Sequence, residues 1–354
     1  MSRSFEPHPQ FRLLRAAIDV PQAVVRRLAG PPIVVDGAEL DPWVQYMLWL
    51  RDRSPQPRWS APGLSLPQRR AMSDREARLG MPLAKGVVVT QAALDGPSGP
   101  LRIRIYRGAR TASEPPILLF LHGGGWSIGS LDGYEGPVRM LARITGAVVV
   151  SLHYRLAPEH PFPAAVADAV AAYDWAMQAS GQLGARAGRV AVMGDSAGGN
   201  LAAVLSTVLR DRGTGPVPLA QGLLYPVTDL TFSQPSHEQF GEGFFLTAQE
   251  MHWFRGQYVP ESAQWQDPMV SPLLAQRHDG LPPTMIWTAG FDVLRDEGEA
   301  YGRALAEAGQ DVEVRQEASM IHGFFNMGMI PGGMERAARV CREMGSLLHR
   351  SSRE

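Results

Sequence analysis

The chain has 354 residues, of which 45% are hydrophobic and 19% are charged, enough for a sizeable core in one large domain. Its formal net charge of −1 gives no electrostatic field for nucleic acid or an anionic membrane, so we expect neither as a partner. Cys341 is the single cysteine of the sequence, which excludes an intrachain disulfide and is compatible with a reducing compartment.

Residues 1–80 predict short helices and no strands. Proline stands at or near the expected helix starts, at Pro21, at Pro42 after Asp41, and at Pro67. The first ten residues are polar and lack the apolar stretch of a signal peptide, and no apolar run in the chain approaches the ~20 residues of a transmembrane helix. We therefore expect a cytoplasmic protein.

From about Gly86 onward, short apolar runs alternate with helical segments such as 164–179. This alternation is typical of an α/β fold with a mostly parallel sheet flanked by helices. A second helical stretch, from Thr228 to about Pro272, interrupts the alternation. Eight strands are predicted, at 86–93, 101–106, 116–121, 147–154, 189–194, 219–225, 284–290 and 312–316.

A run of three glycines follows His122, directly after the predicted strand 116–121. Glycines there allow backbone N–H groups to face a ligand without obstruction by side chains, as in the HGGG oxyanion loop of α/β-hydrolases. The alternatives are a plain turn or a dinucleotide-binding loop, because Gly123, Gly125 and Gly129 also fit such a spacing. The second alternative lacks the Tyr-xxx-Lys pair of short-chain reductases, since Lys85 is the only lysine.

The sequence contains two Gly-x-Ser-x-Gly matches, centred on Ser127 and Ser196. Ser196 lies between an apolar run and a helix-like run, 200–212, as a nucleophile at a strand-to-helix turn requires. Ser127 is followed by Ser130 and a stretch rich in Gly, Asp and Pro, which cannot begin a helix at once. We therefore predict that Ser196 is the nucleophile and that Ser127 is a loop residue.

An acid and a base are expected after the nucleophile in the order Ser, Asp or Glu, His. Asp292 lies just past the predicted strand 284–290, and His322 follows the last predicted strand. Both therefore reach the carboxyl edge of the sheet, where such folds hold their ligands. Asp296 and Glu297 are rivals for the acid role, but negative charge in the first turn of a following helix explains them better.

Five motifs follow one another along the chain, at His122–Trp126, His153–His160, Gly194–Gly198, Asp292–Glu297 and His322–Phe324. In this order they resemble the motifs of the bacterial hormone-sensitive-lipase-like esterases, in the subgroup with Asp before the nucleophile. The resemblance covers the chain from about Gly86 to the C-terminal helix, and one departure from it is Val293, where the family usually has Pro.

The resemblance implies an α/β-hydrolase fold with a helical cap, made of residues 1–80 and of the insertion 228–272 within a catalytic domain 81–354. It further implies a serine esterase without a metal or another cofactor. The residue roles would be Ser196 as nucleophile, His322 as base, Asp292 as the acid that orients it, and Gly124, Gly125 and Ala197 as oxyanion donors. The Tyr154–Glu159 stretch is expected to be structural.

Trp126 and Ile321 adjoin the oxyanion loop and the base, so we expect them to line an apolar pocket for short to medium acyl chains. The expected partner is a small-molecule ester, and a homodimer is compatible with the sequence. Two other functions fit the same scaffold. One is hydrolysis of amides or formamides, and the other is a non-catalytic small-molecule receptor, which the presence of His322 disfavours.

Overall fold

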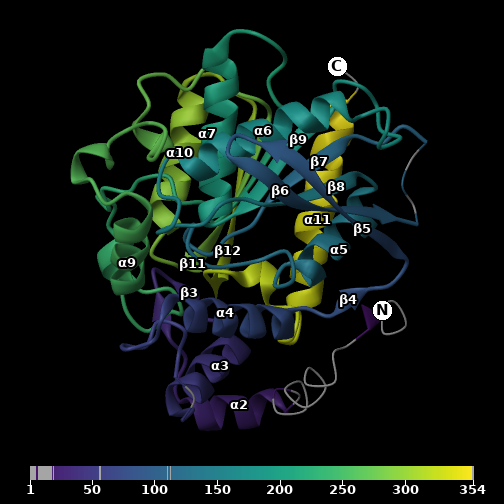
Figure 1. Cartoon of the computed structure of the whole chain (residues 1–354). Helices are drawn as coiled ribbons and strands as arrows, with labels where there is room; N and C mark the ends of the chain where they lie inside the picture. Colours follow the sequence, from purple (N-terminus) through teal and green to yellow (C-terminus); the bar gives the residue numbers. More distant parts are fainter. Residues whose placement is uncertain are drawn as a thin grey trace.

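The computed structural model describes residues 5–6, 18, 20–55, 57–109, 111 and 113–352. Its centre is an eight-stranded sheet with the strand order β12-β11-β10-β9-β7-β8-β6-β5 (Figure 1). β6 is antiparallel to both β5 and β8, and the other neighbouring pairs are parallel. The strands are β5 (Val87–Gly96), β6 (Gly99–Gly108), β7 (Ile117–Leu121), β8 (Val148–His153), β9 (Val190–Asp195), β10 (Gln221–Leu224), β11 (Thr284–Phe291) and β12 (Val312–Ile321).

All eight predicted strands are therefore confirmed, although β12 continues to Ile321 rather than ending at 316. Every residue of β7, β9, β10 and β11 is buried. These strands read as continuous apolar runs because helices cover both faces of a parallel sheet. β5 instead alternates between partly buried and exposed positions over much of its length, as expected for an edge strand.

Five helices accompany this sheet. Figure 1 shows α5 and α11 on one side of it and α7 and α10 on the other. α11 packs against α5, and α6 packs against α7. Cys341 is buried in α11, in agreement with a packing role, and burial raises the pKa of its thiol. The helices are α5 (Glu135–Thr145), α6 (Ala164–Gln178), α7 (Ala197–Arg212), α10 (Arg295–Glu307) and α11 (Gly333–Ser351).

The N-terminal segment forms the three expected helices, α2 (Gln22–Ala29), α3 (Pro42–Arg53) and α4 (Leu66–Gly80). The Asp41 side chain caps α3 by accepting a hydrogen bond of 2.9 Å from Trp43 N. Residues 1–4, 7–17, 19 and 56 of the predicted N-terminal cap lie outside the described residues.

The expectation of no strands in this segment is wrong. Three short strands lie there, where β2 pairs with β3 and β1 pairs with β4, which follows the segment, both antiparallel. Asp36 and Gly37, both at positive φ, close the β2–β3 hairpin, and Asp-Gly is a preferred two-residue turn for such a hairpin. The strands are β1 (Phe5–Glu6), β2 (Val34–Val35), β3 (Ala38–Glu39) and β4 (Leu83–Ala84).

The stretch 228–272 contains α8 (Ser236–Gln239), α9 (Ala248–Tyr258) and the 3-10 turn η2 (Ser262–Gln264), and the 3-10 turn η3 (Pro272–Leu274) begins at its end. α9 begins with a capping box between Thr247 and Glu250. Its Phe254 ring stacks on Trp59, which precedes α4, with ring centroids 5.0 Å apart. The two helical pieces, far apart in sequence, therefore meet through aromatic side chains.

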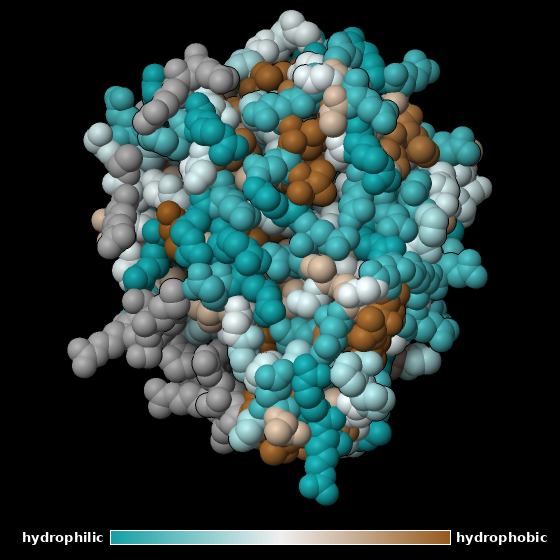
Figure 2. Space-filling model, turned by 180° about the vertical axis from the view of Figure 1, so that it is seen from behind, coloured by the Kyte–Doolittle hydropathy of each residue, from teal (hydrophilic) through white to brown (hydrophobic). Residues whose placement is uncertain are grey.

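The face of the molecule in Figure 2 is mostly hydrophilic, with apolar side chains in small separate patches. The most exposed large apolar side chains are Val34 and Val88, on the short strand β2 and on the edge strand β5. Within the described ranges, no helix is both long and apolar enough to cross a membrane.

Candidate active site

Ser196 lies at a sharp turn between β9 and α7. Its backbone has φ 56° and ψ −119°, a strained conformation for a residue with a side chain. Gly194 and Gly198 flank it, and a Cβ on either glycine would collide with backbone atoms, of Gly198 in the first case and of Leu121 in the second. The glycines are therefore required for the turn, which places the serine at the carboxyl end of the sheet.

Asp292 and His322 complete a hydrogen-bonded chain with this serine. Asp292 directly follows β11, and His322 directly follows β12. His322 Nδ1 lies 2.8 Å from Asp292 Oδ2, and its Nε2 lies 3.0 Å from Ser196 Oγ. All three side chains are buried, and the second Asp292 oxygen accepts a hydrogen bond from Leu294 N at 3.0 Å. A carboxylate held in this way favours the tautomer whose Nε2 accepts the serine proton.

The two rival carboxylates have other partners. Asp296 and Glu297 lie in the first turn of α10, as expected. Asp296 accepts a hydrogen bond from Ser236 N, and the fully buried Glu297 accepts one from Thr228 N at 2.7 Å. Burial raises the pKa of Glu297 well above its usual range. Glu297 thus joins α10 to the start of the 228–272 insertion, a contact that the helix-dipole argument did not predict.

The glycine loop after β7 approaches the turn at Ser196, because β7 and β9 are parallel neighbours. Gly124 has φ 111° and Gly125 has φ 55°, conformations that side chains disfavour. A Cβ on Gly125 would overlap the Phe254 ring of α9. The amides of Ser127 and Ile128 donate to Gly124 O at 3.1 and 3.0 Å and close the turn.

Asp195, which precedes Ser196, connects these two segments. Its Oδ1 accepts a hydrogen bond from Gly123 N at 2.8 Å, and its Oδ2 accepts one from Tyr134 Oη at 2.9 Å. Burial raises the pKa of this carboxyl to about 6. The sequence identifies Asp195 only as part of the motif Gly194–Gly198. The available signal was an ionisable residue within a buried strand end, where it needs a partner.

The loop is also held by the Tyr154–Glu159 stretch. Tyr154 Oη donates to His122 O at 2.7 Å, and its ring stacks on the His122 ring. Burial lowers the pKa of His122 to about 3, so this imidazole is neutral near pH 7. Arg155 forms an ion pair with the buried Asp168. These contacts agree with the structural role expected for the stretch.

Ser127 and the two predicted pocket residues are fully buried. Ser127 lies in the turn after the glycines, and its Oγ has no hydrogen-bond partner among the described residues. Trp126 stacks on Tyr258 of α9, with ring centroids 4.3 Å apart and planes 5° apart. Ile321 is the last residue of β12, next to His322. The predicted contact of Trp126 and Ile321 with an acyl chain stays a prediction.

We found no cluster of three or more His, Cys, Asp or Glu side chains arranged to hold a metal ion within the part of the chain that is described.

Ala197, the third predicted oxyanion donor, is the first residue of α7, so its N–H lies at the N-terminus of that helix. Backbone N–H groups in this position have no partner within the helix and favour negative charge nearby.

Comparison with known proteins places this geometry in a family. Residues 118–326 match the family described as alpha/beta hydrolase fold. The chain is 44% identical over 314 residues to the carboxylic ester hydrolase LipN of Mycobacterium tuberculosis, covering 86% of this chain and 82% of that protein. It is 39% identical over 232 residues to an ethyl acetate hydrolase of Pseudomonas putida, covering 65% and 73% of the two chains.

Solved structures agree. An α/β-hydrolase from the metagenome of Lake Arreo superposes with a TM-score of 0.83 at 37% identity, covering 87% of this chain and 98% of that one. An esterase of Pyrobaculum calidifontis has a TM-score of 0.78 at 34% identity, covering 87% and 99%. The resemblance to the bacterial hormone-sensitive-lipase-like esterases is thus confirmed, and the chain belongs to the α/β-hydrolase family.

Proposed function

We propose that this protein is a serine carboxylesterase that hydrolyses short- to medium-chain acyl esters through an acyl-enzyme intermediate. The observation that carries the proposal is the continuous hydrogen-bonded chain from Asp292 through His322 to Ser196, set at a strained strand-to-helix turn. The esterase and ester hydrolase names of the relatives support the reaction class.

In the proposed reaction, His322 Nε2 accepts the hydroxyl proton as Ser196 Oγ forms a bond to the ester carbonyl carbon. Asp292 holds the imidazole in the required tautomer and stabilises the imidazolium. The tetrahedral intermediate breaks down when His322 gives this proton to the departing alcohol oxygen. Water then adds to the acyl-enzyme in the same way, and the acid leaves.

The carbonyl oxygen becomes an oxyanion during each attack. We assign its stabilisation to the backbone N–H groups of Gly124, Gly125 and Ala197. Each such donor contributes on the order of 3 kcal/mol to the transition state in enzymes of this type. The positive φ of Gly124 and Gly125 and the position of Ala197 at the first turn of α7 support this assignment.

We assign a cap over the site to residues 1–80 and 228–272. The stacking of Trp59 on Phe254, and the close approach of Phe254 to Gly125, support this assignment because both helical pieces then border the oxyanion loop. An apolar cap favours each added acyl methylene by about 0.8 kcal/mol until the pocket wall is reached. Trp126 and Ile321 are the proposed lining residues.

A series of nitrophenyl esters of increasing acyl length tests the proposal. We expect kcat/KM to reach a maximum at short to medium length and to fall steeply for long chains. Efficient hydrolysis of emulsified long-chain triglycerides, with activity rising at the oil-water interface, would contradict the chain-length assignment. Parallel assays of one ester and its matching amide separate an esterase from an amidase, and absence of turnover on both would indicate a receptor.

A further inference from the structure

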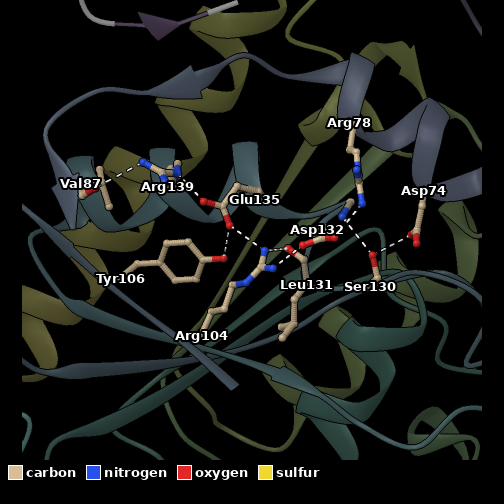
Figure 3. A network of polar contacts seen from close by, with 11 residues as sticks. Asp74, Arg78, Val87, Arg104, Tyr106, Ser130, Leu131, Asp132, Glu135 and Arg139 are labelled. Atoms are coloured by element: carbon tan, nitrogen blue, oxygen red, sulfur yellow. Dashed lines mark hydrogen bonds and ion pairs between the residues drawn. The ribbon is translucent and has the colours of Figure 1, made fainter. Parts of the chain in front are cut away.

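One face of α4 contacts the loop that continues from the oxyanion glycines. Three charged side chains, each four residues from the next, lie on this face: Arg70, Asp74 and Arg78. Arg70 Nε donates to Ser127 O at 2.9 Å, and Ser130 Oγ donates to Asp74 Oδ1 at 2.8 Å. Arg78 forms an ion pair with Asp132, which also contacts Arg104 (Figure 3). This charged face of α4 therefore contacts the loop at three points.

Arg70 acts on the turn that contains Gly124. The carbonyl of Ser127 accepts from Arg70, while the amide of Ser127 donates to Gly124 O at 3.1 Å. Arg70 also donates to Ala157 O at 3.1 Å, and Ala157 N donates to Trp126 O at 2.9 Å. The guanidinium thus fixes the turn from two sides, and a displaced Ser127 would release its bond to Gly124.

Asp74 acts further along the same loop. Ser130 Oγ, which donates to Asp74, also accepts from Gly133 N at 3.1 Å. A Cβ on Gly133 would lie 3.2 Å from Asp74 Oδ1, so helix and loop approach closely there. The next residue, Tyr134, donates to Asp195, which holds Gly123 N. A continuous set of hydrogen bonds and one covalent step therefore leads from α4 to the oxyanion loop.

The three contacts differ in strength. Arg78 and Asp132 have side chains that are 53% and 48% exposed, and exposed ion pairs stabilise little. The Arg70 side chain is 27% exposed and bonds a backbone carbonyl of the fully buried Ser127. Arg70 also pairs with Glu159, which is 49% exposed. Arg70 and Asp74 are therefore the contacts that matter for the loop.

We propose that Arg70 and Asp74 are positioning residues that hold the oxyanion loop in its productive conformation. This inference rests on the proposed function, because it matters only where Gly124 and Gly125 receive an oxyanion. α4 then contributes to the rate of turnover in addition to enclosing the substrate. Asp195 holds the same loop through Gly123.

The main test replaces Arg70 with Met, which keeps an apolar stem and removes the three hydrogen-bond donors used here. Removal of a single oxyanion donor lowers kcat by about 10² to 10³, so a displaced loop should lower kcat by about tenfold. KM on a short-chain nitrophenyl ester should change little. Asp74→Ala should act in the same direction and less strongly, and Arg70→Lys should restore part of kcat because its ammonium still reaches a carbonyl.

Two matched controls separate positioning from general stability. Glu159→Gln removes the ion pair of Arg70 but leaves its bond to Ser127 O, and Arg75→Ala removes an exposed arginine of the same helix. Both should keep the wild-type kcat. An ester and its thionoester analogue supply a readout specific to the oxyanion, because sulfur accepts hydrogen bonds weakly. The kcat/KM for the ester divided by the kcat/KM for the thionoester should fall in Arg70→Met and stay unchanged in both controls.

A rise in KM with unchanged kcat would overturn the inference, and so would an equal loss of kcat in Glu159→Gln. If Arg70→Met does not fold, Arg70→Lys and Asp74→Ala decide by the same kcat and thionoester measurements. Wild type and Ser196→Ala are assayed alongside. Ester hydrolysis that survives in Ser196→Ala refutes the proposed function, whereas normal dependence on Ser196 with unchanged kcat in the α4 variants refutes only the positioning role.

Discussion

The turn at Ser196 and the loop at Ser127 share the sequence pattern Gly-x-Ser-x-Gly but differ in structure. In the first, the serine itself has positive φ, between a strand and a helix, and its Oγ lies 3.0 Å from His322. In the second, the preceding residue, Trp126, has positive φ, and the serine Oγ is buried without a partner among the described residues. Positive φ therefore falls on the serine in the first motif and on the residue before the serine in the second.

This difference shows why the pattern alone does not identify a nucleophile. The residues after Ser196 start α7 at once, so the turn has to be completed at the serine. The residues after Ser127 form further turns up to Tyr134, so the chain changes direction gradually over several residues. The two regions are also coupled, because Asp195 of the first accepts a hydrogen bond from Gly123 of the second.

The largest expected effect comes from replacing the two serines themselves. Ser196→Ala should lower kcat by on the order of 10⁶-fold, as in serine hydrolases that lose their nucleophile. Ser127→Ala should keep kcat and change the free energy of unfolding by about 1 kcal/mol or less, because it removes an unpaired hydroxyl. Ester hydrolysis and urea unfolding measure the two effects, and an organophosphate adduct located by peptide mass on Ser127 would reverse the assignment.

The next effect concerns Asp292, the carboxylate that contacts His322. Asp292 has this contact only in the region of Ser196. Asp292→Asn should lower kcat by about 10⁴, because the amide favours the wrong imidazole tautomer. Asp296→Asn and Glu297→Gln serve as controls and should keep most of kcat, since their partners are Ser236, Arg295 and the backbone at 228–229. A larger loss of kcat in Glu297→Gln than in Asp292→Asn would show that the acid has been misassigned.

A third, smaller effect tests the link between the two regions. The folded-state pKa of Asp195 is about 6, above an unfolded value near 4, so the folded protein binds this proton more tightly. Stability from this group is therefore present at low pH and is lost as pH rises from about 4 to about 6, by up to about 3 kcal/mol.

Asp195→Asn removes this titration. The unfolding free energy of the variant minus that of wild type should become more positive between pH 4 and pH 7, as measured by urea unfolding at several pH values. The control is Ser127→Ala, which leaves Asp195 in place, removes a hydroxyl that does not titrate in this range, and should show no such trend. A flat difference for Asp195→Asn would mean that folding does not raise the pKa of Asp195, and a falling difference would mean that folding lowers it.

The smallest expected effect, that of Arg78→Ala, tests which residues of α4 hold the loop. Arg78→Ala removes an exposed ion pair with Asp132 and should change the free energy of unfolding by less than about 1 kcal/mol. Its kcat should equal that of wild type, in contrast to Arg70→Met. A loss of kcat in Arg78→Ala comparable to that in Arg70→Met would mean that the whole charged face of α4, rather than Arg70 and Asp74, holds the loop.

Much of the fold could be predicted because its signals are local. Buried parallel strands are continuous apolar runs, so β7, β8, β9, β10 and β11 were predicted from short windows. The β2–β3 hairpin was missed although Asp36-Gly37 is a hairpin turn signal, since its strands are only two residues long. The contact of Glu297 with Thr228 was also missed, because it joins residues that are 69 positions apart.

The sequence by itself predicted the eight strands in chain order, Ser196 rather than Ser127 as the nucleophile, and Asp292 and His322 as its partners, because each of these predictions depends on what immediately precedes and follows a motif. Only the tertiary structure decided that Asp195 holds Gly123, that Arg70 and Asp74 contact the same loop, and that Trp126 is fully buried. Each of these is a contact between segments far apart in the chain. Hydrogen bonds and burial of this kind depend on how the elements pack, which neither periodicity nor spacing encodes.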